Sequence, residues 1–227
     1  MEEESKPQTR FFTREDLFAN TKPYGVGIVT FSLIAVCVFV AFYTNLGSEF
    51  ENANPFRITE VQSDGDMARW TRGLPEVRSG QIWRLVGPIF LHFGLIHLLF
   101  NMMWLYDLGS MLEARKSPYF LAGFVVFSGA VSNFAQFYFV NPLFGGMSGV
   151  VYGLFGYIWM KSRYHRGSGF SLHQQTVALM VIWFFVCIFG LVGPVANWCH
   201  GIGLAVGLFW GVLTSPGAFK RIMSGRW

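Results

Sequence analysis

Six long apolar segments limit what this chain can fold into. Hydrophobic residues make up 52% of its 227 residues and charged residues 13%. In soluble domains about 45–50% of residues are apolar and about 25% are charged. A helix crosses the hydrocarbon core of a bilayer with about 20 apolar residues, or fewer where the bilayer is thin. We therefore expect an all-α membrane protein with six transmembrane helices. The expected spans are Val26–Thr44, Gly94–Leu112, Tyr119–Val140, Met147–Met160, Val177–Val192 and Trp198–Leu213.

The distribution of basic residues predicts the orientation of these spans. Twelve of the 17 Lys and Arg residues precede the first span or follow the second, fourth and sixth spans, which places them on one side of the membrane. Because basic residues favour the cytoplasmic side, both termini are predicted to be cytoplasmic. The net charge of +4 then reflects topology, and no nucleic-acid partner is inferred. The twelve residues are Lys6, Arg10, Arg14, Lys22, Arg115, Lys116, Lys161, Arg163, Arg166, Lys220, Arg221 and Arg226.

The chain has room for one membrane domain. We expect this domain over residues 26–213, with a long external loop at 46–92. A cytoplasmic segment, residues 1–25, would precede it, and a cytoplasmic tail, residues 214–227, would follow it. The first residues of the chain are acidic and polar and lack the basic-then-apolar order of a cleaved signal, so the first span is expected to be retained.

Polar residues mark the outward-facing ends of three spans. Ser148 lies between glycines at the start of the fourth span, and Asn197 and His200 open the sixth. His97 and Asn101 lie near the start of the second span. Polar side chains within a bilayer are costly unless they face the protein interior or water. We therefore expect Ser148, His200 and the pair His97 and Asn101 to share one cavity. A nucleophile, a base and hydrogen-bond donors in one cavity indicate hydrolysis within the membrane.

Small residues recur at helical spacing on the fourth and sixth spans. Residues three and four apart share one face of a helix, and small residues on such a face let two membrane helices pack closely. This packing would bring His200 within the hydrogen-bonding distance, about 2.6–3.2 Å, that a nucleophile and its base require. The residues are Gly149 and Gly153 on the fourth span and Gly203, Gly207 and Gly211 on the sixth.

The remaining polar and aromatic residues suggest supporting roles. Tyr152 follows Ser148 by one turn and is expected to pack against the imidazole of His200. His97 and Asn101 are four residues apart, so both side chains leave one face of their helix, and both can donate hydrogen bonds. With the Ser148 backbone amide at the positive end of its helix, they could bind a developing oxyanion.

These motifs together resemble the rhomboid family of intramembrane serine proteases in its compact six-helix bacterial form. The resemblance extends from about Val26 to Leu213. It is specific because it rests on an ordered set of motifs within the expected spans. The motifs are His92-Phe-Gly-Leu-Ile-His97-Leu-Leu-Phe-Asn101, Gly146-Met147-Ser148-Gly149, His200 with the glycines that follow it, Trp83-Arg84, and Glu113-x-Arg115.

The resemblance implies a catalytic dyad of Ser148 and His200 without a third, acidic member. It implies transmembrane segments of other proteins as substrates, cleaved in or near the bilayer, and a location in the bacterial inner membrane with the site open to the extracytoplasmic side. No cofactor is implied, and the oligomeric state stays open. The residues implied around the dyad are His97, Asn101 and the Ser148 amide as oxyanion hole, with Tyr152, His92 and Asn197 as support.

The loops also have counterparts in the family. The loop 46–92 resembles a first loop that is partly embedded in the membrane, with Trp83 and Arg84 as anchors at the interface. The short stretches Asn141–Gly146 and Gly190–Ala196 resemble loops that cap the cavity and admit substrate.

Other functions and mechanisms fit the sequence less well than the protease. An inactive rhomboid-like protein that binds membrane clients would normally lack the serine or the histidine, and a small transporter would carry polar residues through the full depth of the bundle. Cys199 is adjacent to His200, but neighbouring helical positions point about 100° apart. A zinc site is not expected, because the chain has no His-Glu-x-x-His motif and no clustered cysteines.

Overall fold

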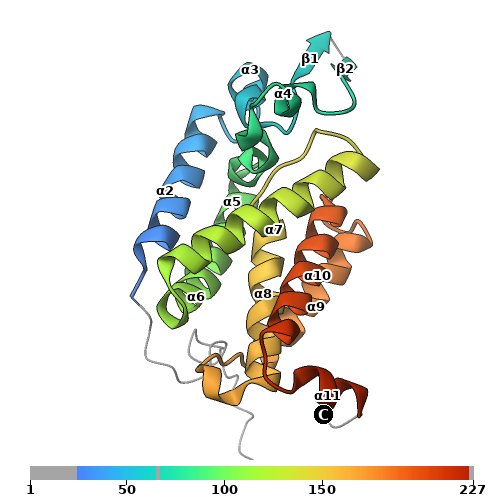
Figure 1. The fold of residues 1–227 in the computed structure, drawn as a ribbon. Coiled ribbons are helices and arrows are strands. Elements are labelled where there is room, and N and C mark those ends of the chain that lie inside the picture. The colour runs from blue at the N-terminus through green and yellow to red at the C-terminus, as the bar shows by residue number, and fades with distance from the viewer. Residues whose placement is uncertain (1–24, 65–66, 225–227) are drawn as a thin grey trace, which may run out of the picture.

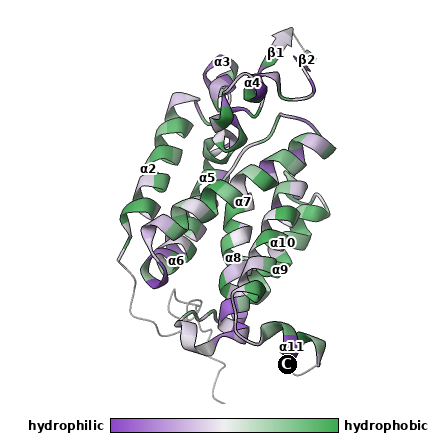
Figure 2. Cartoon of the chain, viewed as in Figure 1, coloured by the Kyte–Doolittle hydropathy of each residue, from purple (hydrophilic) through white to green (hydrophobic). Residues whose placement is uncertain are grey.

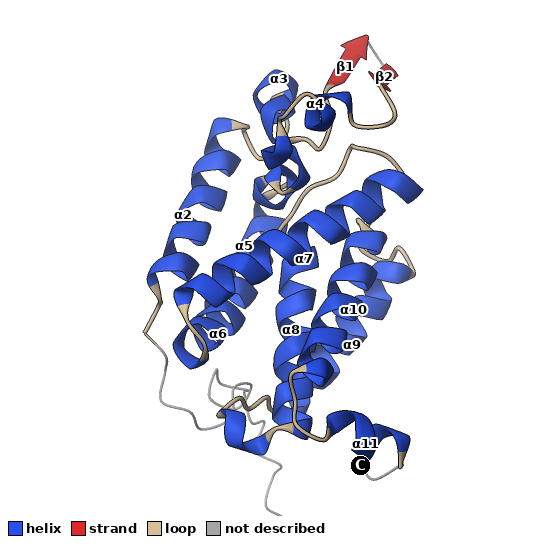
Figure 3. Cartoon of the chain, viewed as in Figure 1, coloured by secondary structure: helices blue, strands red, loops and turns tan. Residues whose placement is uncertain are grey.

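The computed structural model describes residues 25–64 and 67–224, and over these residues the chain is mostly helical (Figures 1 and 3). The expected N-terminal segment 1–25 lies outside the described residues except for Gly25, as do the last three residues of the expected tail. Hydrophilic residues are concentrated toward the two ends of the helix bundle, and apolar residues cover the helices between them (Figure 2).

Six helical segments of the described residues correspond to the six expected spans. The second runs through a π-helical turn, η4, between two α-helices. The fourth is longer than expected and ends at Tyr164, whereas the fifth ends at Ile188, short of Val192. The segments are α2 (Ile28–Tyr43), α5 (Leu95–Trp104) with η4 (Leu105–Gly109) and α6 (Ser110–Arg115), α7 (Pro118–Phe139), α8 (Ser148–Tyr164), α9 (Gln174–Ile188) and α10 (Asn197–Leu213).

Two of these segments are long and apolar enough to cross a membrane by length and composition. They are Leu95–Arg115 and Pro118–Phe139, whereas α2, α9 and α10 are apolar but shorter. A six-fold crossing of the bilayer therefore stays a prediction. A short helix, α11 (Ala218–Met223), follows α10.

The loop between α2 and α5 contains a β-hairpin, which the all-α expectation missed. Strands β1 (Val61–Asp64) and β2 (Met67–Trp70) pair antiparallel, with Val61 opposite Trp70. Strands of four residues are too short to show a convincing two-residue period in the sequence. The loop also contains the short helical elements α3 (Phe50–Ala53), η1 (Asn54–Phe56), α4 (Pro75–Arg78), η2 (Ile82–Leu85) and η3 (Gly87–Phe90).

Arg84 joins the two halves of this loop. Its guanidinium donates to the backbone carbonyls of Asn54 at 3.0 Å and Arg57 at 3.2 Å, and it pairs with the Glu60 carboxylate at 3.0 Å. The Arg84 side chain is buried, whereas 59% of its neighbour Trp83 is exposed. The arginine therefore stabilises the loop internally, and a role of either residue at the membrane interface stays a prediction.

Glu113, near the end of the second segment, caps the N-terminus of α2. Its carboxylate accepts hydrogen bonds from the backbone amides of Val29 at 3.0 Å and Thr30 at 2.8 Å, and from the Thr30 hydroxyl at 2.8 Å. A negative charge at this position complements the unpaired amides and the positive end of the helix dipole. A side chain at Gly27 would clash, since its Cβ would lie 2.1 Å from the Glu113 carboxyl carbon.

Helices α8 and α10 pack backbone against backbone. A Cβ on Gly203 would lie 2.0 Å from the carbonyl oxygen of Gly149, and a Cβ on Gly207 would lie 2.0 Å from that of Gly153. One on Gly211 would lie 2.8 Å from the Tyr157 carbonyl oxygen. The structure therefore places all five predicted glycines in the contact between these two helices.

Replacing Gly203 by Ala should separate α8 from α10, because the added methyl group has no space between the two backbones. We expect a loss of about 1–3 kcal/mol of unfolding free energy, typical of overpacking in a tight interior. Thermal unfolding in detergent measures this loss. Gly201→Ala on the same helix is the matched control, because nothing lies within 4 Å of its Cβ position. Equal stability of the two variants would contradict the packing described here.

Candidate active site

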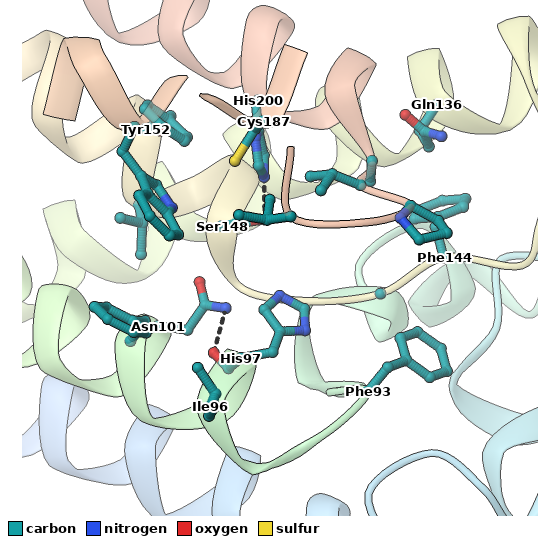
Figure 4. A pocket seen from close by; sticks show the side chains of 18 of the residues that line it. Phe93, Ile96, His97, Asn101, Gln136, Phe144, Ser148, Tyr152, Cys187 and His200 are labelled. Carbon is teal, nitrogen blue, oxygen red and sulfur yellow. Dashed lines mark hydrogen bonds between the residues drawn. The ribbon is translucent and has the colours of Figure 1, made fainter. Parts of the chain in front are cut away.

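A cavity of about 600 Å³ lies between α5, α8, α9 and α10, and it contains most of the predicted site residues (Figure 4). Ser148, His200, His97, Asn101 and Tyr152 all line it. Residues of both predicted capping loops also line it. They are Asn141, Leu143, Phe144 and Gly145 from the first loop and Val192, Pro194, Val195 and Ala196 from the second.

Ser148 and His200 are in direct contact. The Oγ atom of Ser148 lies 2.8 Å from Nε2 of His200, although 52 residues separate them in the sequence (Figure 4). Ser148 is the first residue of α8, so its backbone amide belongs to the unpaired amides at the positive end of the helix. His200 is buried, and no described residue forms a hydrogen bond with its Nδ1. The pair has the geometry of a hydroxyl nucleophile and its general base.

The ring of Tyr152 packs on the imidazole of His200. The two ring centroids are 4.9 Å apart and the planes are tilted by 43°. The Tyr152 hydroxyl donates to the Met180 carbonyl on α9 at 3.4 Å, and the tyrosine ring contacts that of Phe184 on the same helix. Tyr152 therefore restrains the histidine ring and links α8 to α9.

His97 and Asn101 face the cavity from α5. The Asn101 side-chain amide donates to the His97 carbonyl at 2.9 Å, which leaves its second N–H for another acceptor (Figure 4). The His97 ring packs on the backbone just before Ser148, since a Cβ on Gly146 would lie 2.7 Å from its Cε1. Gly146 also has a φ of 123°, a backbone conformation that side chains disfavour.

His92 lies behind His97 and does not line the cavity. It is fully buried, and its ring centroid is 5.2 Å from that of His97. The Met147 amide donates to its Nε2 at 3.5 Å, so Nδ1 carries the proton and donates to the Phe90 carbonyl at 3.1 Å. His92 thus connects the start of α8 to the loop before α5.

The structure does not place the Asn197 side chain in the cavity wall. Asn197 is the first residue of α10 and is half-buried, and its Oδ1 has no hydrogen-bond partner among the described residues. The thiol of Cys199 also lies away from the cavity, since it donates to the Ser132 carbonyl on α7 at 3.5 Å. Within residues 25–64 and 67–224, three or more metal-binding side chains do not cluster anywhere.

Several residues of the cavity wall were not predicted from the sequence. Phe100 on α5 stacks on Trp183 on α9, with ring centroids 5.7 Å apart. Gln136 on α7 accepts a hydrogen bond from the Trp198 amide at 3.1 Å, and Cys187 on α9 adds a thiol to the wall. Apolar and aromatic residues are common throughout these helices, so nothing in the sequence distinguishes those that face the cavity.

Tyr152→Phe and Tyr152→Ala should have different effects on the reactivity of Ser148. The contact with His200 is made by the ring, and the hydroxyl forms only a long hydrogen bond, so Phe should preserve the reactivity and Ala should lower it by about tenfold or more. The rate of labelling by a fluorophosphonate measures this reactivity. Loss of labelling in Tyr152→Phe would instead assign the main contribution to the hydroxyl.

Comparison with known proteins relates this arrangement to a family. The family model described as "Rhomboid domain" matches residues 79–217. The proteins named Rhomboid protease GlpG of Yersinia pestis (strain Pestoides F) and Yersinia pseudotuberculosis (serotype O:3, strain YPIII) are each 40% identical over 134 residues, 57% of this chain and 48% of the relative. That of Yersinia enterocolitica is 33% identical over 190 residues, 81% of this chain and 63% of the relative. The chain thus spans about half the length of the first two relatives.

Proposed function

Because this chain belongs to the rhomboid family, we propose that it is an intramembrane serine protease that cleaves transmembrane segments of other proteins. The observation that carries the proposal is the 2.8 Å contact between Ser148 Oγ and His200 Nε2 inside a bundle of apolar helices. The named relatives, each called a protease, support the same activity.

The proposed reaction uses Ser148 as nucleophile and His200 as general base. Ser148 Oγ attacks the scissile carbonyl carbon while Nε2 of His200 takes the hydroxyl proton. The imidazolium then gives this proton to the leaving amine as the C–N bond breaks, which leaves an ester on Ser148. Water attacks the ester, with its proton passing to His200, and the proton returns to Ser148 as the acid product leaves.

The proposed oxyanion hole consists of His97, the second N–H of Asn101 and the Ser148 backbone amide. All three residues line the cavity, and the amide lies at the positive end of α8. Donors held in place before the reaction stabilise the negative charge that develops on the carbonyl oxygen.

Asn101→Ala should lower kcat by about 10²–10³, the effect of removing one oxyanion donor from soluble serine proteases. Asn101→Asp is a useful companion, since it keeps the size of the side chain and removes its donors. Measurement of kcat on a model transmembrane substrate tests both variants. Unchanged kcat in both would exclude Asn101 from the oxyanion hole.

We place the substrate entry between α5 and α9. Phe100 and Trp183 both line the cavity, and they are 45% and 38% exposed, so the stacked pair separates the cavity from the surroundings of the bundle. A transmembrane segment that displaces this pair would reach Ser148 from the lipid.

The proposed topology has six spans, both termini in the cytoplasm and the site near the extracytoplasmic surface of a bacterial inner membrane. Ser148 and His200 lie at the ends of α8 and α10 that are nearer to the loop between α2 and α5 (Figure 1). Most basic residues lie at the opposite end, among them Lys116 after α6 and Arg163 on α8, whereas five arginines lie in the loop between α2 and α5. This distribution agrees with the preference of basic residues for the cytoplasm.

Neither Ser148→Ala nor His200→Ala should cleave a model transmembrane substrate in liposomes, because each variant lacks one partner of the proton transfer. The native protein should cleave it and should be labelled on Ser148 by a fluorophosphonate. Ser224→Ala, at an exposed serine after α11, is the control and should retain activity. A native protein that is neither labelled nor active would contradict the proposal and would favour client binding or transport.

A further inference from the structure

Lys161 is a buried cation in the last turn of α8. Only 1% of its surface is exposed, and its ammonium donates to the backbone carbonyl of Thr214, the C-cap residue of α10. It also lies 5.7 Å from the centroid of the Tyr157 ring. No acidic side chain in residues 25–64 and 67–224 forms an ion pair with it.

This lysine continues the row of residues through which α8 contacts α10. Gly149, Gly153, Tyr157 and Lys161 follow each other at intervals of four and so share one face of α8. On α10 the row runs through Gly203, Gly207 and Gly211 to Thr214. The site residues lie at one end of this contact, and Lys161 lies at the other end.

The glycines alone leave the alignment of the two helices ambiguous. Gly203, Gly207 and Gly211 recur every four residues on α10, as Gly149 and Gly153 do on α8. A shift of α10 by four residues that sets Gly207 against Gly149 would therefore again place glycine against glycine. Such a shift moves a helix by about 6 Å along its axis. It would break the 2.8 Å contact between His200 and Ser148.

Lys161 removes this ambiguity, because its ammonium group meets the C-terminal end of α10 only in the observed alignment. A buried ammonium loses its hydration, and the loss is compensated only if hydrogen bonds and opposite charge replace the water. The last carbonyls of a helix are unpaired and carry its partial negative charge. In a shifted alignment the ammonium would no longer face the end of α10, whereas an apolar side chain would tolerate either alignment.

We propose that Lys161 is a positioning residue that fixes the alignment of α10 against α8 and thereby holds His200 against Ser148. A single buried polar residue sets the alignment of paired helices in coiled coils by the same principle. The effect on alignment follows from the packing alone, and only the effect on catalysis rests on the proposed function.

A distance measurement tests the alignment without any assay of activity. Spin labels at Arg163→Cys on α8 and Leu213→Cys on α10 occupy exposed positions at the Lys161 end of the contact. We expect one distance in the native background and a second one in Lys161→Met, which keeps an unbranched side chain without the charge. Lys161→Gln is measured in the same way if the Met variant does not fold. Lys220→Met, at an exposed lysine on α11, is the control and should leave a single distance.

The kinetic test compares the same variants on a model transmembrane substrate. Lys161→Met should lower kcat by about tenfold or more, because His200 is displaced in part of the population, and should leave KM unchanged. Lys161→Arg should restore most of kcat, since it keeps the charge. A single unchanged distance with native kcat in Lys161→Met, even at a lower Tm, would overturn the proposal. Absence of cleavage by the native protein would refute the protease function, and the distances would still decide the alignment.

Discussion

The close contact between α8 and α10 is the interaction on which the site depends. The hydroxyl and the imidazole come from different helices, and neither helix could approach the other so closely with side chains at Gly203 or Gly207. Dispersion and close packing hold membrane helices together where the hydrophobic effect gives little, so small residues both stabilise the pair and set its spacing. The glycines that allow α8 and α10 to pack closely therefore also set the distance between Ser148 Oγ and His200 Nε2, across which a proton would be transferred.

Charged side chains at helix ends form a second pattern. Glu113 carries a negative charge to the first amides of α2, and Lys161 carries a positive charge to the carbonyl of Thr214, the C-cap residue of α10. Each sign complements the dipole of the helix end that it contacts. Backbone groups without a partner are costly where water is scarce, so side chains from neighbouring helices serve as partners at these ends. In the first loop Arg84 plays a similar part, since it donates to two backbone carbonyls at once.

The parts of the structure that follow from helical periodicity could be predicted from the sequence, and the family match confirms the resemblance seen in the motifs. Fixed spacing on regular helices made the glycine contact, the approach of His200 to Ser148 and the packing of Tyr152 predictable. The hairpin in the first loop escaped prediction because its strands have four residues each. The sequence could not show that the Asn197 side chain lies outside the cavity wall, because a helix start does not determine which way its first residue points. The partners of Glu113 come from a helix more than 80 residues away, and single-sequence patterns do not show such contacts.

The π-helical turn at Leu105–Gly109 allows the second segment to serve two neighbours. A π turn contains one residue more than an α turn, so every side chain beyond it is rotated by about 100° around the axis. Before the turn in the sequence, Asn101 faces the cavity, and after it the carboxylate of Glu113 reaches the start of α2. A regular α-helix of the same sequence would direct only one of these side chains correctly. Deletion of a single residue from this turn would therefore prevent Asn101 and Glu113 from reaching the cavity and α2 at the same time, although no residue of the cavity or of α2 would be removed.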